Sequence, residues 1–113
     1  MTAATYDLVI DQGSDFAIDL TIKEDSVAKN LTGYSARAQM RKSRTSSAAT
    51  ATFTCTVLTP FTDGKVKMEL SNATSSAMEA GRYYYDLEIH TTNDAIVKRL
   101  IQGEVTINQE VTR

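Results

Sequence analysis

Apolar and polar residues alternate with a period of two along most of this 113-residue chain. Successive side chains of a β-strand point to opposite faces, so this alternation is typical of strands with one face on a core and the other in water. The clearest example is segment 16–23, where Phe, Ile, Leu and Ile alternate with Ala, Asp, Thr and Lys. The pattern predicts an all-β protein.

Comparable runs recur along the chain, separated by turn-forming residues at intervals of about 8 to 12 residues. The runs are 6–11, 16–23, 34–41, 51–57, 65–70, 82–90 and 95–107. Segment 72–80 departs from the strand period and is compatible with a short helical turn, which Ser71 or Asn72 would cap and Gly81 would end. We therefore expect a single domain over 1–113, an immunoglobulin-like antiparallel β-sandwich of about seven or eight strands.

The segment AGRYYYD at 80–86 refines this prediction. Immunoglobulin-type sandwiches carry a tyrosine near the start of one strand whose hydroxyl bonds to the backbone a few residues upstream, with a core residue two positions later. We expect Tyr83 to form this tyrosine corner and Tyr85 to take the core position that a cysteine fills in antibody domains. The alternative is an ordinary strand that is rich in tyrosine.

The last run, 95–107, changes phase along its length. Val97 and Ile101 share one parity, whereas Leu100 lies on the other. A β-bulge inserts one extra residue into a strand, and a glycine inside a strand often marks one. The sequence therefore predicts a bulge at Gly103.

Composition limits the kinds of partner that we expect. The formal net charge is −2, which gives no general attraction to nucleic acid or to an anionic membrane. A single cysteine cannot form an internal disulfide. No window approaches the roughly 20 apolar residues of a membrane span, and the first residues lack the pattern of a secretory signal. We expect a soluble, intracellularly made domain without nucleic-acid or membrane partners.

Candidate catalytic groups are few. His90 is the only histidine, and Glu88 shares its strand face, so the two side chains are a conceivable acid/base pair. No serine or cysteine lies in a recognisable nucleophile motif, and Cys55 falls on an inward face where it behaves as a small apolar residue. The sequence favours a non-enzymatic protein without a cofactor.

Four aspartates recur every fourth residue around the first predicted hairpin. They are Asp7, Asp11, Asp15 and Asp19. A calcium loop would need several oxygen ligands in a D-x-D-x-D-G pattern, and this pattern is absent here. We expect a solvated acidic face rather than a metal site.

Four of the 12 basic residues gather within eight positions, at the end of one strand and the start of the polar loop 42–49. They are Arg37, Arg41, Lys42 and Arg44. Patches of opposite sign fix orientation between docked proteins, so these residues, together with Asp7 and Asp11, are the candidate interface. An ordinary solvated loop is the alternative; nucleic-acid binding would ordinarily add aromatic stacking platforms or a strongly basic domain.

Short phrases spread over the whole chain carry a resemblance to known proteins. They are YDLVIDQGSDF at 6–16, NLTGY at 30–34, AQMR at 38–41, DGKV at 63–66, AGRYYYDLEI at 80–89, GEV at 103–105 and VTR at 111–113. In this order they resemble small structural proteins of tailed bacteriophages and are similar to the N-terminal domains of phage upper-baseplate proteins. These phrases mark turns and strand starts rather than a reacting site.

The resemblance implies a structural component of the virion, made in the cytoplasm of the infected bacterium and present in several copies on the tail or baseplate. Its implied partners are other virion proteins and copies of itself. Two alternatives are a decoration protein on the capsid head and a carbohydrate-binding adhesion module that uses Tyr84 and Tyr34 against host glycans. The third is a small hydrolase that uses Glu88 and His90.

Overall fold

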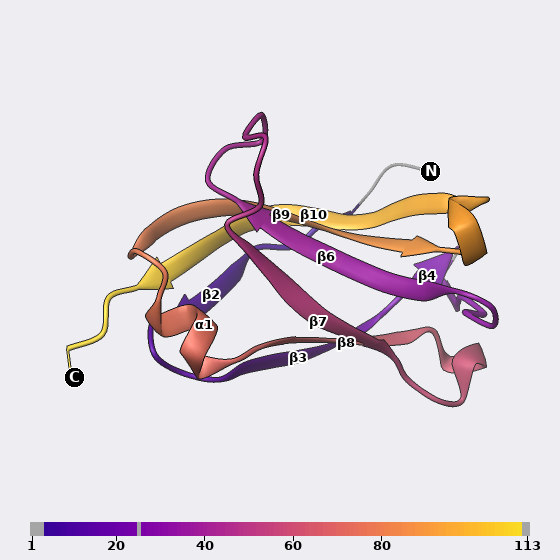
Figure 1. Ribbon diagram of the computed structural model, residues 1–113. Helices are drawn as coiled ribbons and strands as arrows, with labels where there is room; N and C mark the ends of the chain where they lie inside the picture. Colours follow the sequence, from indigo (N-terminus) through magenta and orange to yellow (C-terminus); the bar gives the residue numbers. More distant parts are fainter. Residues whose placement is uncertain (1–3, 25, 112–113) are drawn as a thin grey trace.

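The chain folds into a curled β-sheet with one short helix, and the computed structural model describes residues 4–24 and 26–111 (Figure 1). The strands are β1 (Ala4–Thr5), β2 (Leu8–Asp11), β3 (Phe16–Thr21), β4 (Lys23–Glu24), β5 (Val27–Ala28), β6 (Ser35–Arg41), β7 (Ala51–Val57), β8 (Lys65–Leu70), β9 (Gly81–His90) and β10 (Val97–Asn108). Helix α1 (Asn72–Ser76) and the single-turn helices Phe61–Asp63 and Thr92–Asp94 complete the described elements. The prediction of an all-β sandwich with a short helical turn near 72–80 is confirmed.

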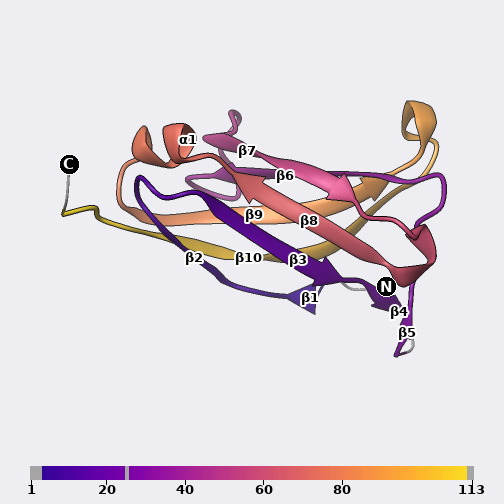
Figure 2. The same cartoon turned by 90° about the horizontal axis from the view of Figure 1, so that it is seen from below.

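One continuous sheet supplies both layers of the sandwich. Its strand order is β1-β10-β9-β6-β7-β8-β3, and β2 also pairs with β10. Strand β7 changes partner along its length: Phe53 pairs with Ala38 of β6, whereas Thr54 pairs with Glu69 of β8. The sheet therefore curls at β7, with β10, β9 and β6 in one layer and β8 and β3 in the other, and Figure 2 shows the two layers from below.

The direction of the first strands differs from the predicted antiparallel arrangement. Strands β1 and β2 both run parallel to β10, with Ala4 opposite Ile101 and Leu8 opposite Val105. Alternation specifies which face of a strand is buried but not the direction of its partner, so the sequence pattern missed this pairing. The very short strands β1, β4 and β5 are further additions to the predicted set.

The core lies between the layers and follows the alternation closely. Along β9, the inward residues Tyr83, Tyr85, Leu87 and Ile89 are all buried. The Phe53 ring of β7 meets the Tyr85 ring edge-on, with 6.1 Å between ring centres. The outward residues of β9 are left on the opposite face of the sheet, where they form the floor of the site described below.

The predicted bulge lies at a different residue. The register of β10 against β9 shifts at Leu100, and both Leu100 and Ile101 are buried as a result. Gly103 instead pairs in register with Tyr85. A side chain at Gly103 would overlap the backbone of Tyr6, so glycine is needed there because the chain crosses close to β10 rather than because the strand bulges.

Candidate functional site

Five arginines gather over the outer face of the β6–β9–β10 layer. They are Arg37, Arg41, Arg44, Arg82 and Arg99, with Arg44 on the loop between β6 and β7. Outward positions of neighbouring strands lie side by side, so acidic residues of β9 and β10 reach three of these side chains. The remaining two, Arg41 and Arg44, give the site its positive charge.

Three of the arginines form ion pairs. Arg37 Nε lies 2.9 Å from Glu88 Oε1, and this bond raises the pKa of the Arg37 guanidinium. Arg99 Nε lies 3.1 Å from Asp86 Oδ2. Arg82 Nε lies 3.6 Å from a carboxylate oxygen of Glu104. Because these charges are compensated within the sheet, the three arginines contribute little free positive charge.

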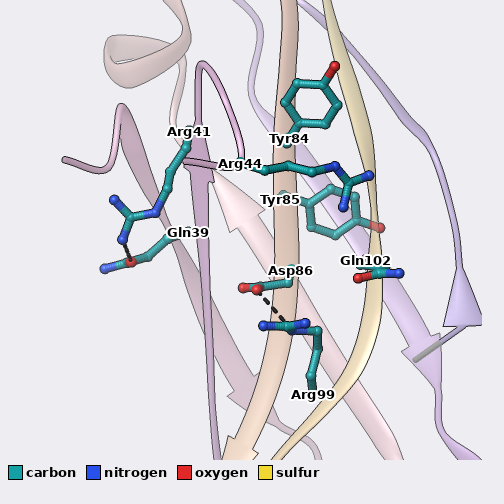
Figure 3. Close-up of a pocket in the computed structure, with 8 residues that line it drawn as sticks. All are labelled: Gln39, Arg41, Arg44, Tyr84, Tyr85, Asp86, Arg99 and Gln102. Carbon is teal, nitrogen blue, oxygen red and sulfur yellow. Dashed lines mark hydrogen bonds and ion pairs between the residues drawn. The ribbon is translucent and has the colours of Figure 1, made fainter. Parts of the chain in front are cut away.

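Arg41 and Arg44 form no ion pair with the residues that the structure describes. Arg41 donates to the backbone carbonyl of Ser46 at 3.2 Å and to the Gln39 side chain at 3.0 Å. The Arg44 guanidinium lies 4.9 Å from the centre of the Tyr84 ring, a cation–π contact. Both residues line one hollow on the outer face, and their guanidiniums point to opposite sides of it (Figure 3).

Lys42 does not lie with Arg41 and Arg44, although the sequence placed all three in one basic patch. Its Nζ lies 3.1 Å from Glu79 and 5.8 Å from the centre of the Tyr83 ring. The hydrogen bond with Glu79 raises the pKa of Lys42. Of the four predicted basic interface residues, the structure thus brings only Arg41 and Arg44 together without a compensating carboxylate among the described residues.

The predicted acidic interface residues lie at the β2 edge of the same layer. Asp7 accepts a hydrogen bond from the Glu104 backbone amide at 3.0 Å, and Asp11 accepts one from the Asn108 side chain at 3.2 Å. Neither carboxylate makes an ion pair within the described part of the chain. Strands β10 and β9 separate this edge from Arg41 on β6, so the two charged groups lie on different parts of one sheet.

The other two aspartates of the predicted acidic face, Asp15 and Asp19, lie away from this edge. Asp15 accepts hydrogen bonds from the backbone and side-chain amides of Asn72 at the start of α1. Asp19 lies opposite Lys67 in the β3–β8 pairing, in the other layer. Over residues 4–24 and 26–111, no three His, Cys, Asp or Glu side chains are arranged to hold a metal ion.

Glu88 and His90, the conceivable acid/base pair, each contact a different side chain. Glu88 is bound by Arg37, and His90 Nδ1 lies 3.4 Å from Asp94 Oδ1. Cys55 is half-buried, and this burial raises the pKa of its thiol to about 11. The thiol therefore stays protonated near neutral pH and is a poor nucleophile.

The two predicted structural tyrosines are both buried and both donate hydrogen bonds. The Tyr83 hydroxyl donates to the Glu79 carbonyl at 2.7 Å, the geometry of a tyrosine corner. The Tyr85 hydroxyl donates to the backbone carbonyl of Tyr6, which ties β9 to the crossing between β1 and β2. Burial raises the pKa of Tyr85, with a smaller contribution from Asp7. Sequence reasoning missed the second contact, because it spans most of the chain.

We call the cavity over β9 the outer-face hollow. It has a volume of about 320 Å³ and is lined by Gln39, Arg41, Arg44, Tyr84, Tyr85, Asp86, Arg99 and Gln102 (Figure 3). The register places Gln39, Asp86 and Gln102 directly beside one another across β6, β9 and β10. Sequence reasoning missed both glutamines, although Gln39 shares the outward parity of Arg41.

The two tyrosines considered for sugar binding lie apart. Tyr84 pairs with Arg41 at the end of β6, whereas Tyr34 precedes the first residue of that strand. Lys29 lies 5.6 Å from the centre of the Tyr34 ring. Only Tyr84 belongs to the outer-face hollow.

Comparisons with known proteins bear on the fold. No protein-family model matches the chain, and no curated protein does. Among solved structures, the chain is similar to the crystal structure of Listeria monocytogenes InlP, with a TM-score of 0.51 and 17% sequence identity. The match covers 94% of this chain and 28% of that one, so the chain spans about a quarter of its length. In the described part of this chain, no helix has the length and apolar content needed to cross a bilayer.

Proposed function

We propose that the chain is a non-enzymatic structural component of a bacteriophage virion that docks in multiple copies on the tail or baseplate. The phage assignment is supported by the ordered sequence phrases that resemble tailed-phage structural proteins. The observation that carries the docking proposal is the separation of opposite charges on one layer, with Arg41 and Arg44 on one side and Asp7 and Asp11 on the other; none of the four forms an ion pair with the residues that the structure describes.

These charges suit a contact between copies. Two strands separate the basic and acidic groups within one chain, so each group is available to a neighbour. A basic patch on one copy that meets the acidic edge of the next is a head-to-tail contact, which closes into a ring when the rotation permits. Such complementarity fixes orientation and suppresses wrong partners.

Charge alone does not hold such a contact. An exposed ion pair contributes about 0 to 1 kcal/mol, whereas a stable interface buries about 800 Å² on each partner. The outer face of the second layer offers small and polar side chains suited to broad contact with other virion proteins. They are Ala17, Asp19, Thr21, Thr54, Thr56, Lys65 and Lys67.

The experiment measures self-association of the purified chain by sedimentation as a function of concentration. The double variant Arg41→Glu/Arg44→Glu and the double variant Asp7→Lys/Asp11→Lys should each weaken association by about tenfold or more. An equimolar mixture of the two should restore it, because the reversed patches are complementary. Thermal melting verifies that each variant is folded.

Lys23→Glu is the matched control, since Lys23 is exposed in the separate β4–β5 sheet and makes no ion pair with described residues. It should associate like the wild type. The docking proposal fails if the wild-type chain stays monomeric and binds no virion protein. It also fails if the reversed variants associate normally or if their mixture does not recover.

A further inference from the structure

The outer-face hollow has features that docking between copies does not require. Its volume of about 320 Å³ lies at the lower end of the range of small-molecule sites. It gathers two guanidiniums without a carboxylate partner among the described residues, and side-chain amides flank Asp86 on both neighbouring strands. These groups match a small ligand that is both anionic and rich in hydroxyls.

Arg44 is the most available cation of the hollow. Its side chain extends from the loop across β9 toward β10, and its guanidinium makes the cation–π contact with the Tyr84 ring (Figure 3). A guanidinium has five N–H donors in a planar fork that matches a carboxylate. The cation–π contact restrains the Arg44 side chain, so less conformational freedom is lost when an anion binds.

Two further arginines set the charge of the hollow. Arg41 spends part of its donor capacity on Ser46 and Gln39, and these bonds hold it in place. Arg99 is neutralised by Asp86 at 3.1 Å. The lining therefore keeps the charges of Arg41 and Arg44 uncompensated, which favours an anionic ligand.

Gln39 and Gln102 add uncharged hydrogen-bonding groups to the lining of the hollow. Gln39 and Gln102 lie on either side of Asp86 in one cross-strand row. Each amide both donates and accepts hydrogen bonds, and sugar hydroxyls do the same. The Gln39 oxygen already accepts from Arg41, and Figure 3 shows both side chains turned away from Arg44, so Gln102 is the amide available beside Arg44.

The floor of the hollow disfavours a peptide ligand. Strands β6, β9 and β10 each have a neighbour on both sides, so their backbone groups are committed to the sheet. A peptide that adds as a strand needs an open edge, which this floor does not offer. The Arg44 guanidinium lies 4.9 Å from the centre of the Tyr84 ring, so it competes with a neutral sugar or base for contact with that ring.

We propose that the outer-face hollow binds a carboxylate-bearing saccharide. Arg44, which crosses β9, holds the carboxylate, and Gln102 on the same side of the hollow contacts a ring hydroxyl (Figure 3). This binding is a property of the single chain and does not rest on the docking proposal.

The experiment titrates the isotope-labelled full chain with glucuronic acid and follows backbone amide shifts. Glucose is the matched neutral analogue, acetate carries the carboxylate without a ring, and glucose 6-phosphate replaces the carboxylate by a phosphate. We expect saturable shifts at the lining residues with a dissociation constant on the order of 1 mM, and responses at least about tenfold weaker to each of the three analogues.

Variants locate the site. Arg44→Ala and Gln102→Ala should each weaken glucuronate binding by about fivefold or more, since each removes direct contacts at the hollow. Arg82→Ala is the matched control, because Arg82 lies on the same outer face, pairs with Glu104 and does not line the hollow. It should bind like the wild type.

The proposal is overturned if glucuronic, galacturonic and N-acetylneuraminic acids all fail to produce saturable shifts at about 50 mM. It is also overturned if Arg82→Ala weakens binding as much as Arg44→Ala. Two further results would overturn the proposal. Equal binding of glucose 6-phosphate would indicate a general anion site, and tighter binding of a hexaglutamate peptide would indicate a protein ligand. Each of these results leaves the charge-reversal test of docking unaffected.

Discussion

The Tyr83 hydroxyl donates a hydrogen bond of 2.7 Å to the backbone carbonyl of Glu79, four residues upstream. Tyr83 is 1% exposed, so this bond fixes the entry of the chain into β9 from inside the core. Strand alternation then directs Tyr84 and Asp86 outward, into the outer-face hollow. The corner therefore connects the packing of the core to the geometry of the candidate site.

Tyr83→Phe should lower the free energy of unfolding by about 1 kcal/mol, because the ring still packs but the partly buried hydrogen bond to the Glu79 carbonyl is lost. Urea denaturation measures the change. Tyr84→Phe is the control, since the Tyr84 hydroxyl makes no hydrogen bond within the described part of the chain, and it should change stability by less than about 0.5 kcal/mol. Equal effects of the two substitutions would contradict the corner.

Ser75 joins α1 to the turn between β2 and β3. It is fully buried, accepts from the Gly13 amide at 3.1 Å and donates to the Ser14 carbonyl at 2.9 Å. Ser75→Ala should cost about 2 kcal/mol, because both backbone groups lose their partner in a buried site. Ser76→Ala, on the exposed side of the same helix, should cost little. A comparable loss for both variants in thermal melts would argue against this role.

Gly103→Ala should destabilise the fold by about 2 kcal/mol through overpacking, since the new methyl group meets the Tyr6 backbone. The Tyr6 amide donates to the Gln102 carbonyl at 2.9 Å, so its hydrogen exchange should accelerate more than that of the β9 amides. Thr106→Ala, at an exposed position of the same strand, is the control and should leave exchange unchanged. Unaltered exchange at Tyr6 in Gly103→Ala would contradict the close approach.

Stability should fall in alkaline solution. Burial raises the pKa of Cys55 to about 11 and also raises the pKa of Tyr85. Groups that stay neutral in the folded state stabilise it fully below their unfolded pKa values, and this contribution is lost as the pH rises toward their folded values. Unfolding in urea should therefore become easier above about pH 9. Cys55→Ala and Tyr85→Phe should each flatten this dependence; a slope unchanged in both would contradict it.

Cys55 should also react slowly with iodoacetamide. At about pH 8 the folded chain holds far less thiolate than the unfolded chain, so alkylation should be much slower until urea is added. The measurement is the rate of mass gain with and without denaturant. Equal rates would show that the thiol is not shielded.

Local patterns in the sequence were sufficient to predict the strand faces and the helical turn. Alternation predicted the inward positions of β9, from Tyr83 to Ile89, because a half-buried strand requires it. The helix cap was also predictable from local sequence. Ser71, one of the two residues expected to cap the helix, accepts a hydrogen bond from the Thr74 amide through its hydroxyl.

Features that depend on distant partners were not predictable in this way. The parallel direction of β1 and β2, the sheet change within β7 and the function of Gly103 all depend on which segments meet in space. The same holds for the candidate site. Lys42 leaves the basic patch because Glu79 is nearby, and Gln102 joins the outer-face hollow through the β9–β10 register.

The most direct test of the central claim is labelled electron microscopy of purified phage particles that carry a tagged copy of this chain, with its copy number measured by quantitative mass spectrometry. We predict several symmetry-related copies per particle, located on the tail or baseplate. Label on the head surface would contradict the tail placement and identify a decoration protein. Absence of the chain from purified particles would contradict the virion assignment itself.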